Sequence, residues 1–210
     1  MSQNDTVLKQ KICELIEYNC EGEYWDFKAA WEEKKPVDLV LDIINFANTC
    51  SNQDCYIIFG VKNPRPGDKE ATVLGIQKGD FRRTEDSINN LLESIPFAEE
   101  MPSIKVRTIE YGTTEKQIDV LIIENCLNTP IYLRRPYDHL KAGAIYARHG
   151  SVNTAIGSTA DPKTTEKLWA KRFKLLDSPL KQYLEIIALW DFKNISINIT
   201  QDALYINKQA

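Results

Sequence analysis

Residues 55–59 form a continuous apolar run that ends at Gly60. Five consecutive apolar residues, several of them β-branched or aromatic, are typical of a strand that is buried on both faces. The rest of the chain must therefore cover both sides of this strand. Its 210 residues, 43% of them hydrophobic, are enough for one large domain with such a core.

The segments around this run alternate between helical and strand-like patterns. Apolar residues at helical spacing predict helices at residues 5–18, 36–48 and 84–95, and after the start signals Asp161-Pro162 and Ser178-Pro179. The second of these helices has Asp42 and Asn45 on its polar face, and the fourth has Phe173 on its apolar face. Alternating or β-branched segments predict strands at residues 24–28, 72–76, 104–108, 118–124, 131–133, 144–148 and 195–199. We expect 72–76 to pair antiparallel with 55–59, and 104–108 to form a hairpin with 118–124. This mixture predicts an α+β fold with a mixed, mostly antiparallel sheet packed by helices.

The domain organisation and the cellular setting follow from the same sequence. We expect residues 1–176 to form the main domain, and 177–210 to form an appended helix and strand that start a further module. No apolar run approaches the roughly 20 residues needed to span a bilayer, and the polar N-terminus predicts no signal peptide. The five cysteines show neither a disulfide framework nor zinc-site spacing. We therefore expect reduced cysteines in a cytoplasmic protein.

The net charge of −4 is distributed unevenly along the chain. Residues 1–130 hold fourteen Lys or Arg against twenty-three Asp or Glu, whereas residues 131–181 hold ten against four. This basic segment is either an electrostatic surface for phosphates or a solvated basic face, and the sequence leaves both interpretations open. The candidate phosphate contacts, which could equally be polar loop or strand-end residues, are Arg134, Arg135, Lys141, Arg148 and His149.

Catalytic chemistry has one candidate location. The chain has no Gly-rich phosphate loop ending in Lys-Ser or Lys-Thr, no G-x-S-x-G elbow, and only two histidines. Glu21 and Asp26, by contrast, are two carboxylates near the edge of a predicted strand, with Lys28 two residues further on. Such a pair can hold a divalent ion that activates water, while the lysine stabilises the developing charge. Alternating Asp and Lys also occur on many solvated strands, so the pattern alone is weak.

A family resemblance strengthens this candidate. Residues 21–28, Glu-Gly-Glu-Tyr-Trp-Asp-Phe-Lys, resemble the opening E-x-x-x-x-E-F-K motif of the Schlafen AlbA-type domain. Five further segments resemble later elements of that family and follow in the same order: residues 44–49, 56–61, 74–76, 130–132 and 145–151. The resemblance spans roughly residues 14–176 and implies the Schlafen AlbA-like fold.

The resemblance also implies functions. Animal members of the family include endoribonucleases that act on transfer and ribosomal RNA through three carboxylates. Bacterial members are described as DNA-binding regulators, defence proteins or ATP-binding proteins. Glu21 and Asp26 match the first two acid positions, while the third falls at Lys62-Asn63, so Asn63 is the expected third ligand and Asp68 a substitute.

Two functions stay open at this point. The first is a nucleic-acid-binding module for RNA or single-stranded DNA, in a bacterial-type regulator or defence protein. The second is a metal-dependent endoribonuclease with Mg²⁺ or Mn²⁺ on Glu21, Asp26 and Asn63, and with Lys28 as a catalytic residue. ATP binding is a third expectation, and assembly into a homo-oligomer is a further one.

Overall fold

The structure, a computed structural model, describes residues 3–64, 71–112, 116–175, 195–199 and 204–208. It divides the chain into two units, Met1–Arg172 and Phe173–Ala210. The second unit contains an antiparallel hairpin of β9 (Ile195–Ile199) and β10 (Leu204–Lys208), so the strand predicted at 195–199 is confirmed. The helix predicted after Ser178-Pro179 and the domain boundary expected after residue 176 lie outside the described residues.

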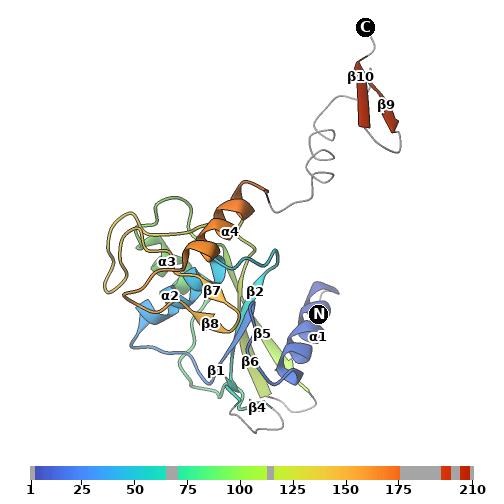
Figure 1. Cartoon of the computed structure of the whole chain (residues 1–210). Helices are drawn as coiled ribbons and strands as arrows, with labels where there is room; N and C mark the ends of the chain where they lie inside the picture. The colour runs from blue at the N-terminus through green and yellow to red at the C-terminus, as the bar shows by residue number, and fades with distance from the viewer. Residues whose placement is uncertain (1–2, 65–70, 113–115, 176–194, 200–203, 209–210) are drawn as a thin grey trace. The chain divides into compact units, whose positions relative to one another are not determined.

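A four-stranded mixed sheet forms the centre of the first unit (Figure 1). Its strands, in spatial order, are β1 (Trp25–Lys28), β2 (Cys55–Phe59), β6 (Lys116–Ile123) and β5 (Ile104–Tyr111). β1 runs parallel to β2, and the other two neighbouring pairs are antiparallel. The predicted α+β class, the mostly antiparallel sheet and the hairpin of its last two strands are therefore confirmed.

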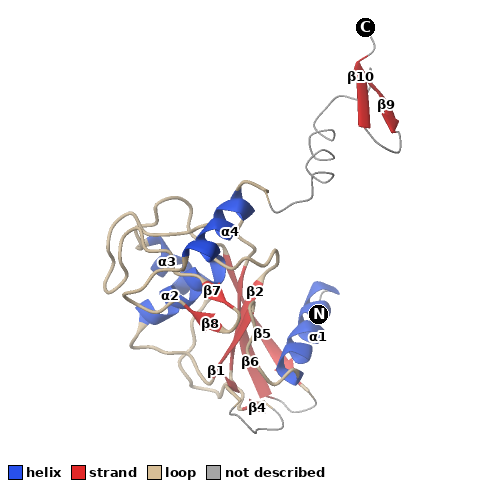
Figure 2. Cartoon of the chain, viewed as in Figure 1, coloured by secondary structure: helices blue, strands red, loops and turns tan. Residues whose placement is uncertain are grey.

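Helices cover both faces of this sheet (Figure 2). α1 (Gln3–Glu17) packs on one face, while α2 (Pro36–Ala47) and α3 (Glu85–Glu93) pack on the other. The side chains of β2 alternate between the two cores: Ile57 lies in the core under α2 and Ile58 in the core under α1. Every residue of β2 is buried, as its unbroken apolar run predicts.

The helix start signals in the sequence work as expected. Pro36 occupies the first turn of α2, where its missing N–H removes no helical hydrogen bond. Thr84 caps α3 by accepting a hydrogen bond from the backbone N–H of Ser87. Asp161 does the same for α4 (Pro162–Arg172), accepting from the N–H of Thr164.

Two strand predictions are wrong. Residues 72–76 do not pair with 55–59; instead β4 (Thr72–Val73) pairs with β3 (Val61–Lys62), because the chain turns at Gly60, whose φ of 90° favours glycine. The antiparallel neighbour of β2 is β6. Residues 131–133 form no strand, although Leu133 makes an isolated bridge to Phe97, and of the strand predicted at 144–148 only Arg148 lies in one, β7 (Arg148–His149). The apolar residues of these two segments belong to loops and pack against the core. A short apolar pattern by itself does not distinguish such a loop from a strand.

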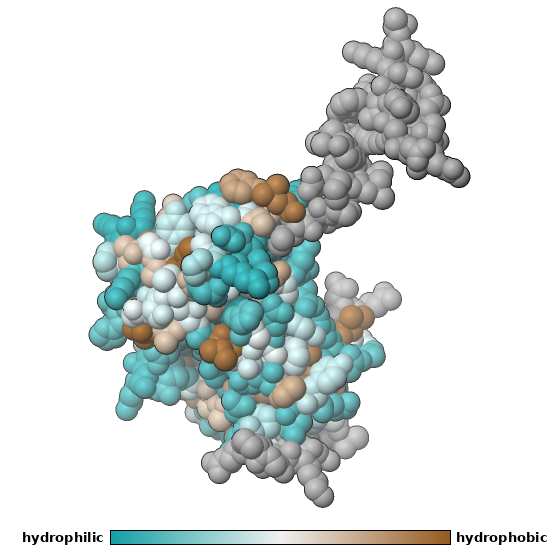
Figure 3. Space-filling view, in the orientation of Figure 1, coloured by the Kyte–Doolittle hydropathy of each residue, from teal (hydrophilic) through white to brown (hydrophobic). Residues whose placement is uncertain are grey.

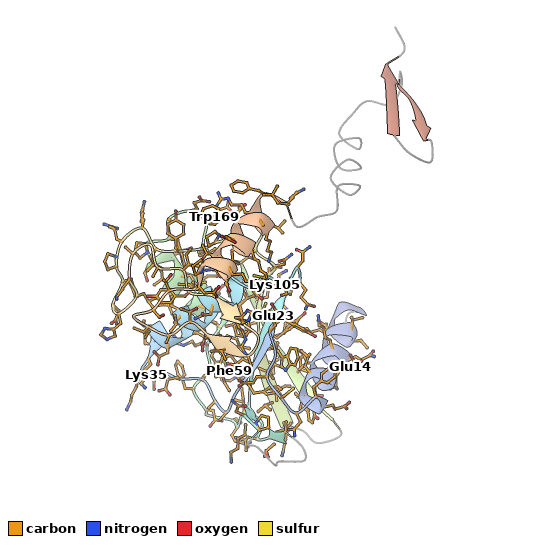
Figure 4. The ribbon with its side chains drawn as sticks, in the orientation of Figure 1. Glu14, Glu23, Lys35, Phe59, Lys105 and Trp169 are labelled. Carbon is orange, nitrogen blue, oxygen red and sulfur yellow. The ribbon has the colours of Figure 1, made fainter. Side chains whose placement is uncertain are left out.

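Two side chains lie elsewhere than the helical patterns predict, and the burial of a third, Trp31, was not decided by the sequence. Asn45, predicted on the polar face of α2, is fully buried and bonds the backbone N–H of Thr154 through its Oδ1. Phe173, predicted in the apolar face of the last described helix, follows the end of α4 and is 61% exposed. Trp31 is buried, stacking on Phe59 with ring centroids 3.6 Å apart (Phe59 is labelled in Figure 4).

The surface and the cysteines agree with the composition. The face drawn in Figure 3 is mostly hydrophilic, with small separate hydrophobic spots. All five cysteines are free thiols. In the part of the chain that the structure describes, no helix has the length and apolar character needed to cross a membrane.

Candidate functional site

A groove of about 810 Å³ opens where the end of β1 meets two small hairpins. One hairpin is β3–β4, and the other joins β7 (Arg148–His149) to β8 (Val152–Asn153). We call this depression the motif groove. Its lining residues are Glu21, Asp26, Phe27, Lys28, Ala29, Lys62, Asn63, Pro64, Arg148, Ser151, Val152 and Asn153.

β1 places the motif side chains by its alternation. Trp25 and Phe27 pack toward the core under α1, as predicted, which leaves Asp26 and Lys28 on the opposite face. Asp26 is nevertheless only 4% exposed. Lys28 Nζ lies 3.0 Å from Asp26 Oδ2, so the acid and the lysine of the motif form an ion pair on the same face of the strand.

Glu21 and Asp26 are brought together, as the motif predicts. Their side chains share a hydrogen bond, and Glu21 also accepts one from the backbone N–H of Phe27. Burial, the hydrogen bond with Asp26 and its negative charge raise the pKa of Glu21 to about 8. Burial alone would raise the pKa of Asp26, but the bond from Glu21 and the charge of Lys28 outweigh it and lower that pKa. The directions of both shifts favour the proton on Glu21 and the negative charge on Asp26.

A third carboxylate, on α2, completes the network. Lys28 Nζ lies 3.1 Å from Asp42 Oδ2, almost the same distance as from Asp26. Burial alone would lower the pKa of Lys28, but the charges of Asp42 and Asp26 raise it, so the ammonium group stays protonated. Burial raises the pKa of Asp42 despite Lys28, and Asn153 donates a hydrogen bond to its Oδ1.

Arg148 donates hydrogen bonds to the backbone of residues 22–25, which we call the motif loop. It is 2% exposed, and its guanidinium donates to the carbonyl oxygens of Gly22 and Trp25 and to Oδ1 of Asn153. The same group lies 3.8 Å from Asp26 Oδ1. The sequence predicted either a phosphate contact or a polar strand end, whereas the structure places Arg148 among internal hydrogen-bond acceptors.

The other predicted nucleic-acid contacts lie outside the groove lining. Arg134, Arg135, Lys141 and His149 are all exposed, so each can meet solvent or a ligand. His149 belongs to β7, whose turn to β8 lines the groove. Lys141 donates a hydrogen bond to the carbonyl of Gly157 at 3.2 Å. The described part of the predicted basic segment is therefore distributed over loops, β7 and α4 (Pro162–Arg172), and of its basic residues only Arg148 lines the groove.

The residues at the motif do not fit a divalent ion in this arrangement. Asn63, the expected third ligand, does line the same groove as Glu21 and Asp26. Both oxygens of Asp26, however, already face a cationic group, and the raised pKa of Glu21 opposes the ionised form that a metal ligand needs. Within the described residues, no three His, Cys, Asp or Glu side chains are placed to hold a metal ion together.

Sequence reasoning missed two members of this network, Asp42 and Asn153. Asp42 was recognised only as part of a polar helix face, and Asn153 was not singled out. Asp42 pairs with Lys28 and Asn153 accepts from Arg148, and the hydrogen bond between Asp42 and Asn153, 111 residues apart, joins the two halves of the network. The only sequence signal was an acidic residue on the helix face opposite the apolar stripe.

Comparison with known proteins agrees with this geometry. A family model described as Schlafen, AlbA_2 matches residues 21–157, which is more than half of the chain. The chain belongs to the Schlafen AlbA_2 family. The matched range begins at Glu21, the first acid of the motif, and includes every residue that lines the motif groove. No curated protein matches the chain.

The Schlafen AlbA_2 domain thus contains the whole charged network. The motif residues Glu21 and Lys28 lie in one segment, and Arg148 lies more than 100 residues further along the chain. Hydrogen bonds and ion pairs join Arg148 to the motif segment. In this member the network includes Asp42, while Lys62 and Asn63 stand where the family resemblance implies a third acid.

Proposed function

We propose that this Schlafen AlbA_2 domain binds RNA or single-stranded DNA through the sugar–phosphate backbone, along the motif groove. The observation that carries the proposal is the groove itself, whose two walls offer Lys62 and Asn63 on one side and Ser151 on the other. Lys, Asn and Ser side chains are common phosphate contacts, and such contacts position a strand without reading its sequence.

Charge within the groove supports an anionic ligand. The carboxylates Asp26 and Asp42 are already compensated by Lys28, with Arg148 beneath Asp26. The exposed ammonium group of Lys62 then adds a positive charge at the rim. The chain as a whole is acidic, so this local charge rather than the net charge must attract the strand.

The test is fluorescence anisotropy with short RNA and DNA oligonucleotides at several salt concentrations. Lys62→Glu should weaken binding of both, and the slope of log affinity against log salt should flatten by about 0.7 for each lost contact to a single strand. Lys9→Glu is the matched control, because α1 covers the other face of the sheet. Equal affinities of these two variants would contradict the groove as the binding surface.

A second variant tests the basic segment separately. Arg134→Glu combined with Arg135→Glu reverses two exposed charges outside the groove. If the strand continues from the groove over this loop, the double variant should lower affinity further and flatten the salt slope again. Unchanged binding would confine the interface to the groove.

Metal-dependent cleavage of RNA is the second candidate, because Glu21, Asp26 and Asn63 line one groove and the first two match the acids of the family motif. Incubation of transfer RNA and single-stranded DNA with the protein, with and without Mn²⁺, followed on a denaturing gel, separates it from binding alone. Metal-dependent products that disappear in Asp26→Asn would establish the nuclease. We expect binding without cleavage.

The cellular role follows from the family alone. We propose that the domain serves a bacterial-type regulator or defence protein. No contact among the described residues favours ATP binding. The cytoplasmic location and the homo-oligomer stay predictions, the latter open to measurement of the molar mass in solution.

A further inference from the structure

One ammonium group lies between two carboxylates that come from different elements. Lys28 Nζ is 3.0 Å from Asp26 Oδ2 on β1 and 3.1 Å from Asp42 Oδ2 on α2. Asp42 is held in turn by the amide of Asn153, at 2.9 Å. The lysine is thus coordinated by oxygens from two sides, in the way that a bound cation would be.

We infer that the ammonium group of Lys28 takes the place of a divalent metal ion in this site, so that the motif groove works without a metal. Asp42 is then a positioning residue, which holds the ammonium group against Asp26. The inference deepens the proposed nucleic-acid-binding function, but it concerns the site's cation and can be tested without any nucleic acid.

Compensation of Asp26 is the first argument. This carboxylate is 4% exposed, and a buried charge must be paired to be stable. Its Oδ2 meets Lys28 and its Oδ1 faces the guanidinium of Arg148 at 3.8 Å. The protein's own cations therefore supply the compensation that a metal ion would supply. An arriving divalent ion would have to displace Lys28 and would meet repulsion from Arg148.

The composition of the groove rim is the second argument. Mg²⁺ and Mn²⁺ bind best where several carboxylate oxygens converge. The rim instead offers the neutral amide of Asn63 and the ammonium group of Lys62. The third carboxylate of the network, Asp42, is directed to Lys28 rather than to open space. Both oxygens of Asp26 and one oxygen of Asp42 are thus already paired with cationic side chains of the protein.

The experiment measures Mn²⁺ binding directly, from the electron paramagnetic resonance signal of free Mn²⁺ titrated with the full chain. The parent protein should show no saturable binding up to about 1 mM, a concentration typical of weak oxygen-ligand sites. Lys28→Met keeps the aliphatic stem but removes the charge between Asp26 and Asp42. It should therefore create a saturable site, at least about tenfold tighter than in the parent, since Mn²⁺ prefers such hard oxygen ligands.

Two controls isolate the position of the charge. Lys62→Met removes an exposed lysine from the same groove, and it should not produce this gain. Asp42→Asn added to Lys28→Met should abolish the new site, because it removes one of the two carboxylates. Equal gains in Lys28→Met and Lys62→Met would overturn the inference.

The parent protein alone decides the matter if Lys28→Met does not fold. A parent Kd for Mn²⁺ below about 100 μM would refute a metal-free site, as would a rise in melting temperature at a Mn²⁺ concentration well above that value. If the parent binds oligonucleotides, EDTA should leave the affinity unchanged, and a loss on chelation would also count against the inference. Failure to bind any oligonucleotide would refute only the proposed function.

Discussion

Replacement of Arg148 by alanine should destabilise the first unit more than any exposed charge substitution. The Arg148 side chain is 2% exposed and stacks on the Phe46 ring, with 4.5 Å between the guanidinium and the ring centroid. It donates to the carbonyls of Gly22 and Trp25 at 2.8 and 3.2 Å, and to Asn153 at 2.7 Å. Alanine would remove this donor from the Gly22 carbonyl and from Asn153, would leave the Trp25 carbonyl with the Gly22 N–H, and would remove one of the two cations of Asp26.

The expected magnitude follows from these contacts. A buried acceptor left unsatisfied costs about 1–3 kcal/mol, and removal of one partner from a buried ion pair costs about 3–5 kcal/mol. The contributions overlap, because one side chain makes them all. The Asp26 contact is long, and Lys28 still compensates that carboxylate. We therefore expect Arg148→Ala to lower the free energy of unfolding by about 4 kcal/mol, which is a large fraction of the stability of a typical domain.

The assay is urea denaturation followed by tryptophan fluorescence. Trp25 reports on the motif loop, since its Nε1 donates to the carbonyl of Cys20 and its own carbonyl accepts from Arg148. Arg148→Lys keeps the charge but loses the planar fork of donors, so it should cost roughly half as much as alanine. Arg134→Ala, at an exposed position, should change stability by less than about 0.5 kcal/mol.

The result can refute the reasoning in a specific way. If Arg148→Ala lowers the free energy of unfolding by less than about 1 kcal/mol, its internal hydrogen bonds do not hold the motif loop. If stability is unchanged but oligonucleotide affinity falls, Arg148 acts as a phosphate contact, and the buried position would not describe its working state.

Three further predictions concern the same unit. Glu21→Gln mimics the protonated carboxyl group. Because the folded-state pKa of Glu21 is raised to about 8, the parent should lose more than about 1 kcal/mol of stability as the pH rises from about 5 through 8. Urea denaturation of the variant should show a flatter dependence of stability on pH. Asp119→Asn removes the charge of a buried carboxylate that pairs with the exposed Arg82 and accepts from Trp31 and Thr108; it should lower the free energy of unfolding by about 2 kcal/mol in the same assay, whereas a loss under about 1 kcal/mol would mean that these contacts are not structural. Gly22→Ala would place a Cβ about 2.1 Å from the Trp25 ring, so the ring must move; an unshifted emission spectrum and unchanged melting temperature would contradict that contact.

Local pattern was sufficient for most of the secondary structure. The unbroken apolar run of β2 indicated burial on both faces, and the caps at Thr84 and Asp161 marked true helix starts. These signals work because side-chain periodicity and capping depend on residues within one turn or one strand. They fail where pairing is long-range: residues 72–76 looked like a partner for β2, but the turn at Gly60 directs β4 to β3.

The candidate site shows the same division. By itself, the sequence determined that Glu21, Asp26 and Lys28 belong together, because they lie within eight residues and resemble a family motif, and the family match confirms that membership. Only the tertiary structure decided what surrounds them. Electrostatic compensation of the buried Asp26 comes from Lys28 of the same strand and from Arg148 of β7, and Asp42 of α2 holds Lys28 in place. The role of Asp42 was therefore not readable from its helix, nor was the burial of Arg148 from its strand.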